Sequence, residues 1–257
     1  DLYKTQNIQI PIDSSISHLI NASRLLSDSW LLNNTDSLTF SVLTEVTHIY
    51  RIAKAILSLK SEPNISFHLK KLLSGNLNLL ERKRSSAKDF LWEIELFSTL
   101  KDHGLSPIIK EPDVQISVSG TVISFACKKI YSEKNFSKTL SNAVAQIEKS
   151  RCPGIVAINI DELHPNQEIL NGYSQKAINK VIQDFNASFI NKHDFYFRKY
   201  LASSRIISCL VSSSLVVDIH NESPRINNAT QMTFWNIPNL SQARQNLVSR
   251  FYDCFKN

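Results

Sequence analysis

Apolar residues recur along this chain at two different spacings, and the spacing changes near residue 85. Between about residues 13 and 80 they recur at i, i+3, i+4 and i+7, as in residues 42–57. This spacing is typical of amphipathic helices and predicts a helical N-terminal module, preceded by an extended segment over residues 1–12. A further helix is predicted over residues 86–102, where a serine can cap the start and Gly104 can end the helix.

Shorter apolar runs follow this helix and predict a sheet. A strand is expected near residues 107–110, and two more within residues 111–130, joined by a turn at Ser119-Gly120. The segments expected after them are a helix over 135–151, a buried strand over 154–160, a helix near 174–200, strands near 205–219 and 231–237, and a helix over 241–255. The order α-β-β-β-α-β predicts an α/β domain over residues 86–257, after a helical module over residues 1–85.

Composition and charge narrow the classes of partner. The chain has 257 residues, of which 42% are hydrophobic, and a net charge of +6. A mild positive excess permits nucleic-acid binding. The densest basic run, residues 81–88, fits either a solvated helix end or a patch that contacts phosphates. We therefore take Arg82, Lys83 and Arg84, together with Lys129, as candidates for phosphate contact.

Cysteine usage and missing motifs exclude several classes of protein. Cys127, Cys152, Cys209 and Cys254 are dispersed without a CxxC pair, which predicts reduced thiols in a cytoplasmic protein rather than a zinc site. No signal peptide is expected, and the most apolar stretch, residues 206–219, is too short and too serine-rich to span a bilayer. No GxxxxGK[ST] phosphate loop and no GxSxG elbow occurs in the sequence.

Four polar residues fall at suggestive places in this pattern: Glu93, Asp113, Lys128 and Gln146. Glu93 lies inside an apolar helix face, Asp113 opens a strand, Lys128 ends the next strand, and Gln146 lies in the following helix. Alternate residues of a strand share a face, so Lys128 shares its face with Ala126. Phosphodiester hydrolysis requires such a set, because carboxylates hold Mg²⁺ and a lysine stabilises developing negative charge.

These residues resemble the motifs of the PD-(D/E)xK nuclease superfamily, in particular its Mrr-like restriction-endonuclease branch. The helix "WEIELFSTLKDHGL", the acid in "PDV", the lysine in "FACKKI" and the glutamine in "AVAQIEKS" carry the resemblance, which covers about residues 86–162. It implies a restriction-endonuclease-like mixed sheet flanked by helices and a catalytic set of Glu93, Asp113, Lys128 and Gln146. Glu95 competes with Glu93, which we favour because its spacing to Gly104 resembles the family's.

The sequence departs from the family's pattern at Ala126, where an acid or a glutamine is expected. Three explanations stay open. Glu93 and Asp113, with the backbone carbonyl of Cys127, hold Mg²⁺ or Mn²⁺ alone. A carboxylate from elsewhere has taken the role, and the candidates are Glu95, Glu111 and Glu133. Or the site is inactive.

Three hypotheses from different classes follow. The first is a Mg²⁺-dependent DNA endonuclease in bacterial restriction or antiphage defence, a setting that the family resemblance implies. The second is a nuclease fold without chemistry that binds DNA or a partner protein. The third is an unrelated α/β structural protein, in which Glu93 on its helix face and the strand "FACKK" match the motifs by accident. Asp113, Lys128 and Gln146 each have an ordinary alternative role, as a turn cap, a surface lysine and a solvated helix residue. The expected partners are DNA and either further copies of the chain or a partner defence protein. The chain is expected to act in the cytoplasm and not to bind a membrane.

Overall fold

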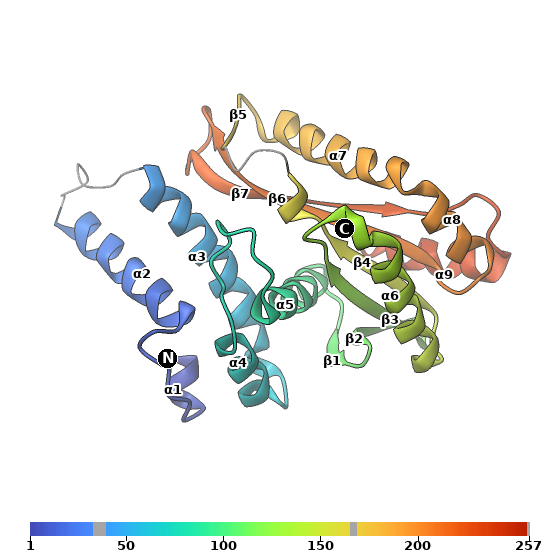
Figure 1. Ribbon diagram of the computed structural model, residues 1–257, viewed down its shortest axis with the longest axis horizontal. Helices are drawn as coiled ribbons and strands as arrows, with labels where there is room; N and C mark the ends of the chain where they lie inside the picture. Colours follow the sequence, from blue (N-terminus) through green and yellow to red (C-terminus); the bar gives the residue numbers. More distant parts are fainter. Residues whose placement is uncertain (33–39, 165–168, 256–257) are drawn as a thin grey trace. The chain divides into compact units, whose positions relative to one another are not determined.

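The computed structural model describes residues 1–32, 40–164 and 169–255. The N-terminal region is helical, as the 3.6-residue spacing predicts (Figure 1). Its elements are α1 (Leu2–Thr5), α2 (Ser15–Leu31), α3 (Phe40–Ser58), η2 (Leu59–Ser61), α4 (Ile65–Leu73) and α5 (Ser86–Asp102). The segment over residues 1–12 was expected to be extended, and this expectation is wrong at α1. Tyr3 is buried there and donates to the carbonyl of Leu69, a contact between distant residues that local patterning cannot reveal.

Among the described residues, the sheet has seven strands in the order β1-β2-β3-β4-β6-β5, with β7 paired to β6. The strands are β1 (Ile108–Lys110), β2 (Asp113–Val118), β3 (Thr121–Lys129), β4 (Gly154–Asn159), β5 (Leu170–Gly172), β6 (Ser208–Ile219) and β7 (Ile226–Trp235). Strands β1, β2 and β3 pair antiparallel, whereas β3, β4 and β6 run parallel to one another, so the sheet is mixed. The expected α/β class is confirmed.

The remaining elements follow the predicted order with shifted boundaries. The short helices η3 (Glu133–Asn135) and η4 (Asp161–Leu163), and the helices α6 (Phe136–Ser150), α7 (Gln175–Lys192), α8 (Asp194–Ala202) and α9 (Gln242–Asp253), complete the list. The single helix expected near residues 174–200 is wrong, because the chain breaks at His193 between α7 and α8. No glycine or proline stands there. The imidazole instead bonds to Glu133 and packs on Phe136, contacts that only the folded chain provides.

The chain forms two compact units. The first comprises the described residues within Asp1–Ile94, Asn166–Ile178 and Leu215–Ala229, and the second those within Glu95–Pro165, Asn179–Ser214 and Thr230–Asn257. The boundary predicted between residues 85 and 86 stays a prediction.

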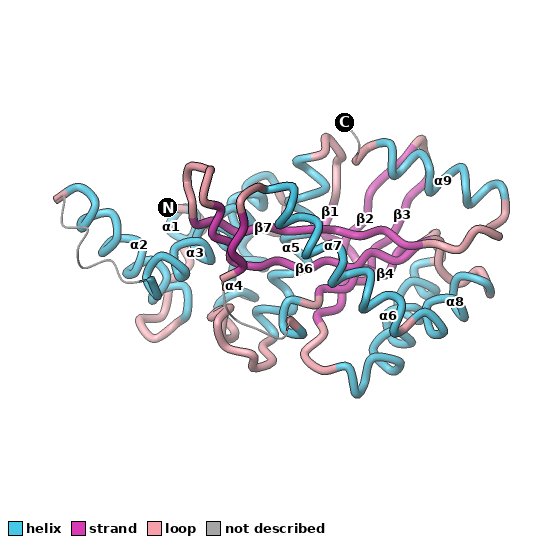
Figure 2. Tube along the Cα trace, turned by 90° about the horizontal axis from the view of Figure 1, so that it is seen from above, coloured by secondary structure: helices cyan, strands magenta, loops and turns pink. Residues whose placement is uncertain are grey.

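The second unit has a core on each face of its strands. On one face, Ala126, Val156 and Cys209 of the strands pack with residues of α6, α7 and α8. Figures 1 and 2 show α6 running alongside β3 and β4. On the other face, Phe125 packs against Phe251 of α9, with ring centroids 5.7 Å apart. Alternation along β3 therefore buries both faces in the middle of the strand. Lys128, near its end, is partly exposed.

A tight turn connects β2 to β3. Ser119 and Gly120 have positive φ angles of 49° and 79°, which two-residue hairpin turns require and which glycine adopts without strain. The turn sets the register Val118↔Thr121 through Val114↔Phe125. It thereby brings the start of β2 beside the end of β3. In the part of the chain that the structure describes, no helix has the length and apolar run needed to cross a membrane.

Candidate active site

The start of β2 and the end of β3 are joined by a side-chain hydrogen bond. The backbone N–H of Cys127 donates to Oδ2 of Asp113 over 2.6 Å. The antiparallel register explains this contact: Val114 pairs with Phe125, so Asp113, the residue before Val114, lies beside Ala126 and next to Cys127. The Asp113 side chain is 12% exposed, so its carboxylate lies at the edge of the core with limited contact to water.

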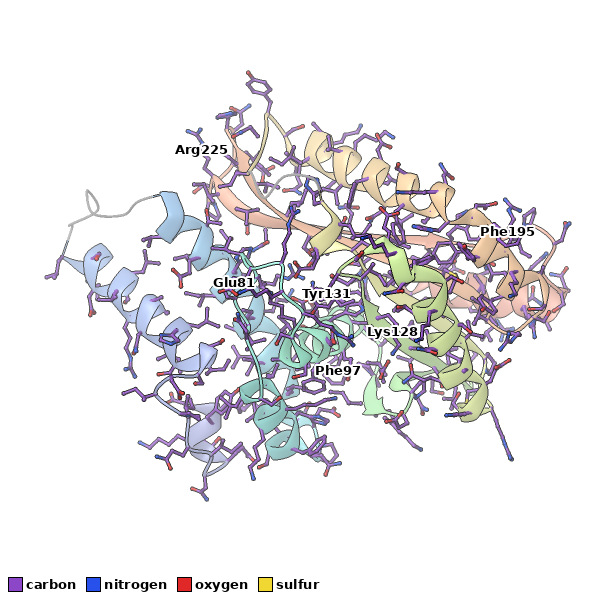
Figure 3. All side chains as sticks on the ribbon, in the orientation of Figure 1. Glu81, Phe97, Lys128, Tyr131, Phe195 and Arg225 are labelled. Carbon is purple, nitrogen blue, oxygen red and sulfur yellow. The ribbon has the colours of Figure 1, made fainter. Side chains whose placement is uncertain are left out.

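Lys128 reaches the same carboxylate from the same face of the sheet. Its Nζ lies 3.7 Å from Oδ2 of Asp113, and its side chain is 23% exposed. Figure 3 labels Lys128 and also Tyr131, which follows the end of β3. A partly buried pair is screened less by salt than a surface pair. The site thus contains the Asp113 carboxylate and the Lys128 ammonium, at the ends of two adjacent strands.

Ala126 lies between these groups in sequence but belongs to the apolar core. It is fully buried in the cluster that includes Val144 and Ile147 of α6 and Val156 of β4. A carboxylate at position 126 would need a charged or polar partner inside this cluster. The alanine therefore fits its surroundings, whereas an acid there would require a metal or a rearranged α6.

Gln146 lies on α6, the helix that covers the Ala126 face of the sheet. Its Oε1 is buried and has no hydrogen-bond partner among the described residues. An unpaired buried amide oxygen costs about 1–3 kcal/mol. Such an atom is a feature of functional sites as well as of imperfect packing.

Glu93 lies on α5 in the first unit, beside Lys71 of α4. Its side chain is 15% exposed, and Oε2 lies 3.6 Å from Nζ of Lys71. The Lys71 ammonium also stands 4.0 Å from the ring centroid of Phe90. Glu93 is thus a half-buried carboxylate with a cationic neighbour. Its convergence with Asp113 and Lys128 stays a prediction.

Glu133 and Glu111, two of the other residues considered for the missing acid, have contacts of their own. Glu133 lies 2.7 Å from Lys192 and 2.9 Å from His193. The hydrogen bond from Lys192 lowers the pKa of Glu133 below its usual range, with a smaller contribution from His193. Glu111 accepts a bond from Gln115 through its backbone carbonyl. For Glu95 the role stays a prediction.

The basic run over residues 81–88 ends in a buried lysine that bonds to the backbone of the same run. Arg82, Lys83 and Arg84 are exposed, and Arg84 lies 3.6 Å from Asp89. Lys88 is 1% exposed and donates to the carbonyl oxygens of Glu81 and Lys83. The last residue of the run therefore fixes its loop, a role that the sequence alone did not indicate. Phosphate contact by the three exposed residues stays a prediction.

Lys129, the fourth candidate for phosphate contact, points into a buried polar network. Its side chain is 3% exposed, and Nζ donates to Oδ1 of Asn159 over 2.8 Å. Asp161 and Glu162 each place a carboxylate oxygen 3.6 Å from the same Nζ. Contact between Lys129 and a phosphate stays a prediction, and it would require this network to open. Sequence reasoning missed the partners, although they directly follow a buried strand, where ligands of parallel sheets often bind.

The donors predicted for a metal are those that Mg²⁺ prefers. Magnesium takes oxygen ligands and is often held by one or two carboxylates, with water and substrate phosphates completing its shell. The Asp113 carboxylate and the Cys127 carbonyl fit this chemistry in kind. Within residues 1–32, 40–164 and 169–255, no three or more His, Cys, Asp or Glu side chains gather in a metal-binding group.

The four cysteines form no disulfide bonds. Cys127, Cys152, Cys209 and Cys254 are all free thiols. Burial raises the pKa of Cys209 far above its usual range.

No family model, no curated protein and no solved structure matches the chain. What is established is therefore a mixed α/β fold with a helical N-terminal region, in which Asp113 and Lys128 meet at adjacent strand ends.

Proposed function

We propose that this chain is a Mg²⁺-dependent DNA endonuclease of the PD-(D/E)xK type, acting in bacterial restriction or antiphage defence. One observation carries the proposal: the Asp113 carboxylate and the Lys128 ammonium lie 3.7 Å apart on one face of a mixed sheet. They do so within the order α-β-β-β-α-β that the hydrophobic pattern of the sequence predicts. The buried, unpartnered Oε1 of Gln146, on the helix over that face, supports the same assignment.

The roles follow from the chemistry of each group. Asp113, with the backbone carbonyl of Cys127, would hold the metal, which when bound polarises the phosphate and activates water. Glu93 as a further ligand stays a prediction. Lys128 orients the attacking water and stabilises the charge that develops on the phosphate. The Cys127 N–H holds the Asp113 carboxylate in place. Gln146 supplies an amide at the same face of the sheet.

The substrate class follows from the charge of the chain and from the resemblance. A net charge of +6 and the exposed residues Arg82, Lys83 and Arg84 supply phosphate-binding groups. These contacts contribute affinity that does not depend on base sequence and that falls with salt. DNA is the substrate that the restriction-endonuclease resemblance implies.

The test is cleavage of supercoiled plasmid by the purified chain with Mg²⁺ or Mn²⁺. The variants are Asp113→Asn, Lys128→Ala and Lys138→Ala, the last a control at an exposed lysine of α6. We expect the first two variants to lose cleavage and the control to keep it. A chelator should abolish cleavage by the wild type and by the control. Single-stranded RNA of matched length tests the preference for DNA. Undiminished cleavage by Lys128→Ala would remove the proposed mechanism.

A second function is favoured by the burial of Ala126. An alanine fills this fully buried position in an apolar cluster, so residue 126 supplies no metal ligand. The chain would then be a nuclease fold that binds DNA or a partner protein without cutting. Metal-independent DNA binding by wild type and Lys128→Ala alike, with no cleavage by either, would favour this function over the first.

A further inference from the structure

The carboxyl ends of three parallel strands bring a second set of polar residues together. Lys129 of β3 pairs in register with Asn159 of β4, which pairs with Ser212 of β6. Residues paired in register share a face of the sheet, so these three side chains lie on one face. Asn159 and Ser212 are fully buried, and the Lys129 side chain is 3% exposed.

Two carboxylates complete the surroundings of the Lys129 ammonium. Asp161 and Glu162 belong to η4, directly after β4, and each has an oxygen 3.6 Å from Nζ. The other oxygen of Asp161 accepts the backbone N–H of Ser214 in β6 over 2.8 Å. The network therefore ties the end of β3 to η4 and, through Asp161, to β6.

The orientation of the Asn159 amide is set by this network. Its Oδ1 accepts from Lys129 and also, over 3.3 Å, from the backbone N–H of Asp161. If the amide were flipped, its NH₂ group would face the Lys129 ammonium and the backbone N–H of Asp161, which are both donors. Its Nδ2, like Oγ of Ser212, has no hydrogen-bond partner among the described residues. The bond to Lys129 thus decides how this buried side chain sits.

Lys129 is the sequence neighbour of Lys128, and successive strand residues face opposite sides of the sheet. We propose that Lys129 is a positioning residue: its buried contacts with Asn159, Asp161 and Glu162 hold the end of β3 so that Lys128 faces Asp113. This role rests on the proposed nuclease function. It replaces surface phosphate contact as the use of Lys129, because a phosphate could reach the ammonium only by separating it from these oxygens.

The two roles of Lys129 predict different kinetics. A lysine that contacts phosphate contributes to substrate affinity, so its loss raises KM and lowers the salt dependence of binding. A positioning residue acts after binding, and a misplacement of about 1 Å can reduce the rate by about a hundredfold. We expect Lys129→Met to lower kcat about tenfold or more, with KM within about twofold and an unchanged salt dependence.

Two further variants guard against misfolding, because Lys129→Met leaves buried carboxylates without their cation. Asn159→Ala removes the 2.8 Å bond but keeps every charge, and Lys129→Met combined with Glu162→Gln removes one of the two carboxylates. Both should lower kcat in the same direction. Lys138→Met, which removes an exposed lysine of α6, is the matched control for net charge and should leave kcat unchanged.

An NMR measurement separates this proposal from the nuclease function. The amide proton of Cys127 reports its hydrogen bond to Asp113, whether or not the protein cleaves DNA. It should move upfield in Lys129→Met and in Asn159→Ala, and stay in place in Lys138→Met. Absence of cleavage by the wild type would count against the nuclease while this signal still tested positioning. An unmoved Cys127 signal, or a raised KM with unchanged kcat, would overturn the positioning role.

Discussion

Asp113 accepts the backbone N–H of Cys127 over 2.6 Å, so the acid that opens β2 is bonded to the strand that presents Lys128. This bond gives the carboxylate a structural role besides any catalytic one. Substitutions at Asp113 must therefore be chosen to separate the two, since a loss of cleavage alone does not distinguish a missing charge from a displaced strand.

Asp113→Ala and Asp113→Asn should differ in stability and agree in activity. Alanine removes the acceptor and leaves a part-buried N–H unpaired, which lowers the free energy of unfolding by about 1–3 kcal/mol. Asparagine keeps an oxygen in place, and we expect a loss of less than about 1 kcal/mol. Both should abolish cleavage, because neither carries a negative charge. Urea unfolding and plasmid cleavage on the same preparations measure the two effects. Equal destabilisation by the two variants would contradict a structural role for the bond.

Lys128→Ala should abolish cleavage and leave the fold nearly unchanged. The side chain is 23% exposed at a strand end, so its loss removes little packing. Its charge matters mainly when the phosphate becomes more negative in the transition state, and removing such a group lowers kcat by about 10²–10³-fold. Steady-state kinetics and a thermal melt check both points, with Lys138→Ala measured in parallel.

Ala126→Glu should destabilise the metal-free protein and make its stability depend on metal. A carboxylate at this fully buried position enters the cluster around Val144 and Ile147. We expect a cost of about 2 kcal/mol or more. If position 126 faces the metal, Mg²⁺ or Mn²⁺ should recover part of this loss, because a bound ligand stabilises the folded state. Thermal melts with and without metal, with Ala126→Gln as an uncharged control, decide the point. Equal melting temperatures of Ala126→Glu in both conditions would argue against a metal at this face.

His193 should make stability fall as the pH drops below about 6.5. Burial lowers the pKa of His193 from its ordinary value of 6.5, and this effect exceeds the opposing one of the Glu133 carboxylate. The folded state therefore binds the imidazole proton less well than the unfolded chain. The stabilising contribution is complete above about pH 6.5 and is lost as the pH falls through the lowered pKa.

The measurement is the difference in melting temperature between wild type and His193→Gln, taken from pH 8 to pH 5. Glutamine can also donate to Glu133 but does not titrate, so the wild type should lose more stability over this range. The pKa of Glu133 is itself lowered from 4.5 and acts at more acidic pH. Parallel curves for the two proteins would show that His193 does not titrate differently in the fold.

The Cys209 thiol should be protected from reagents in the folded protein. It is fully buried, and burial raises its pKa, so little reactive thiolate forms. A thiol reagent should modify Cys152 and Cys254, which are partly exposed, well before Cys209. Peptide mapping by mass spectrometry after timed labelling tests this order. Because all four thiols are free, a reductant should not change the melting temperature.

Features that depend on local spacing could be predicted from the residues alone. The 3.6-residue and 2-residue patterns predict the helical N-terminal region and the order α-β-β-β-α-β. Strand alternation places Ala126 and Lys128 on one face, and the turn at Ser119-Gly120 follows from residues that tolerate positive φ angles. These properties arise from residues a few positions apart, which is why pattern alone suffices for them.

Which polar groups meet depends on the folded chain. Lys129 and the run around Arg82 carry the same positive charge in the sequence, yet Lys129 is buried with Asn159, Asp161 and Glu162 while Arg82 is exposed. The break at His193 and the helix at Leu2–Thr5 likewise depend on partners about sixty residues away. Folding brings distant segments together, as the parallel strands β3 and β4 do for Lys129 and Asn159, and burial then fixes the partners of each charge.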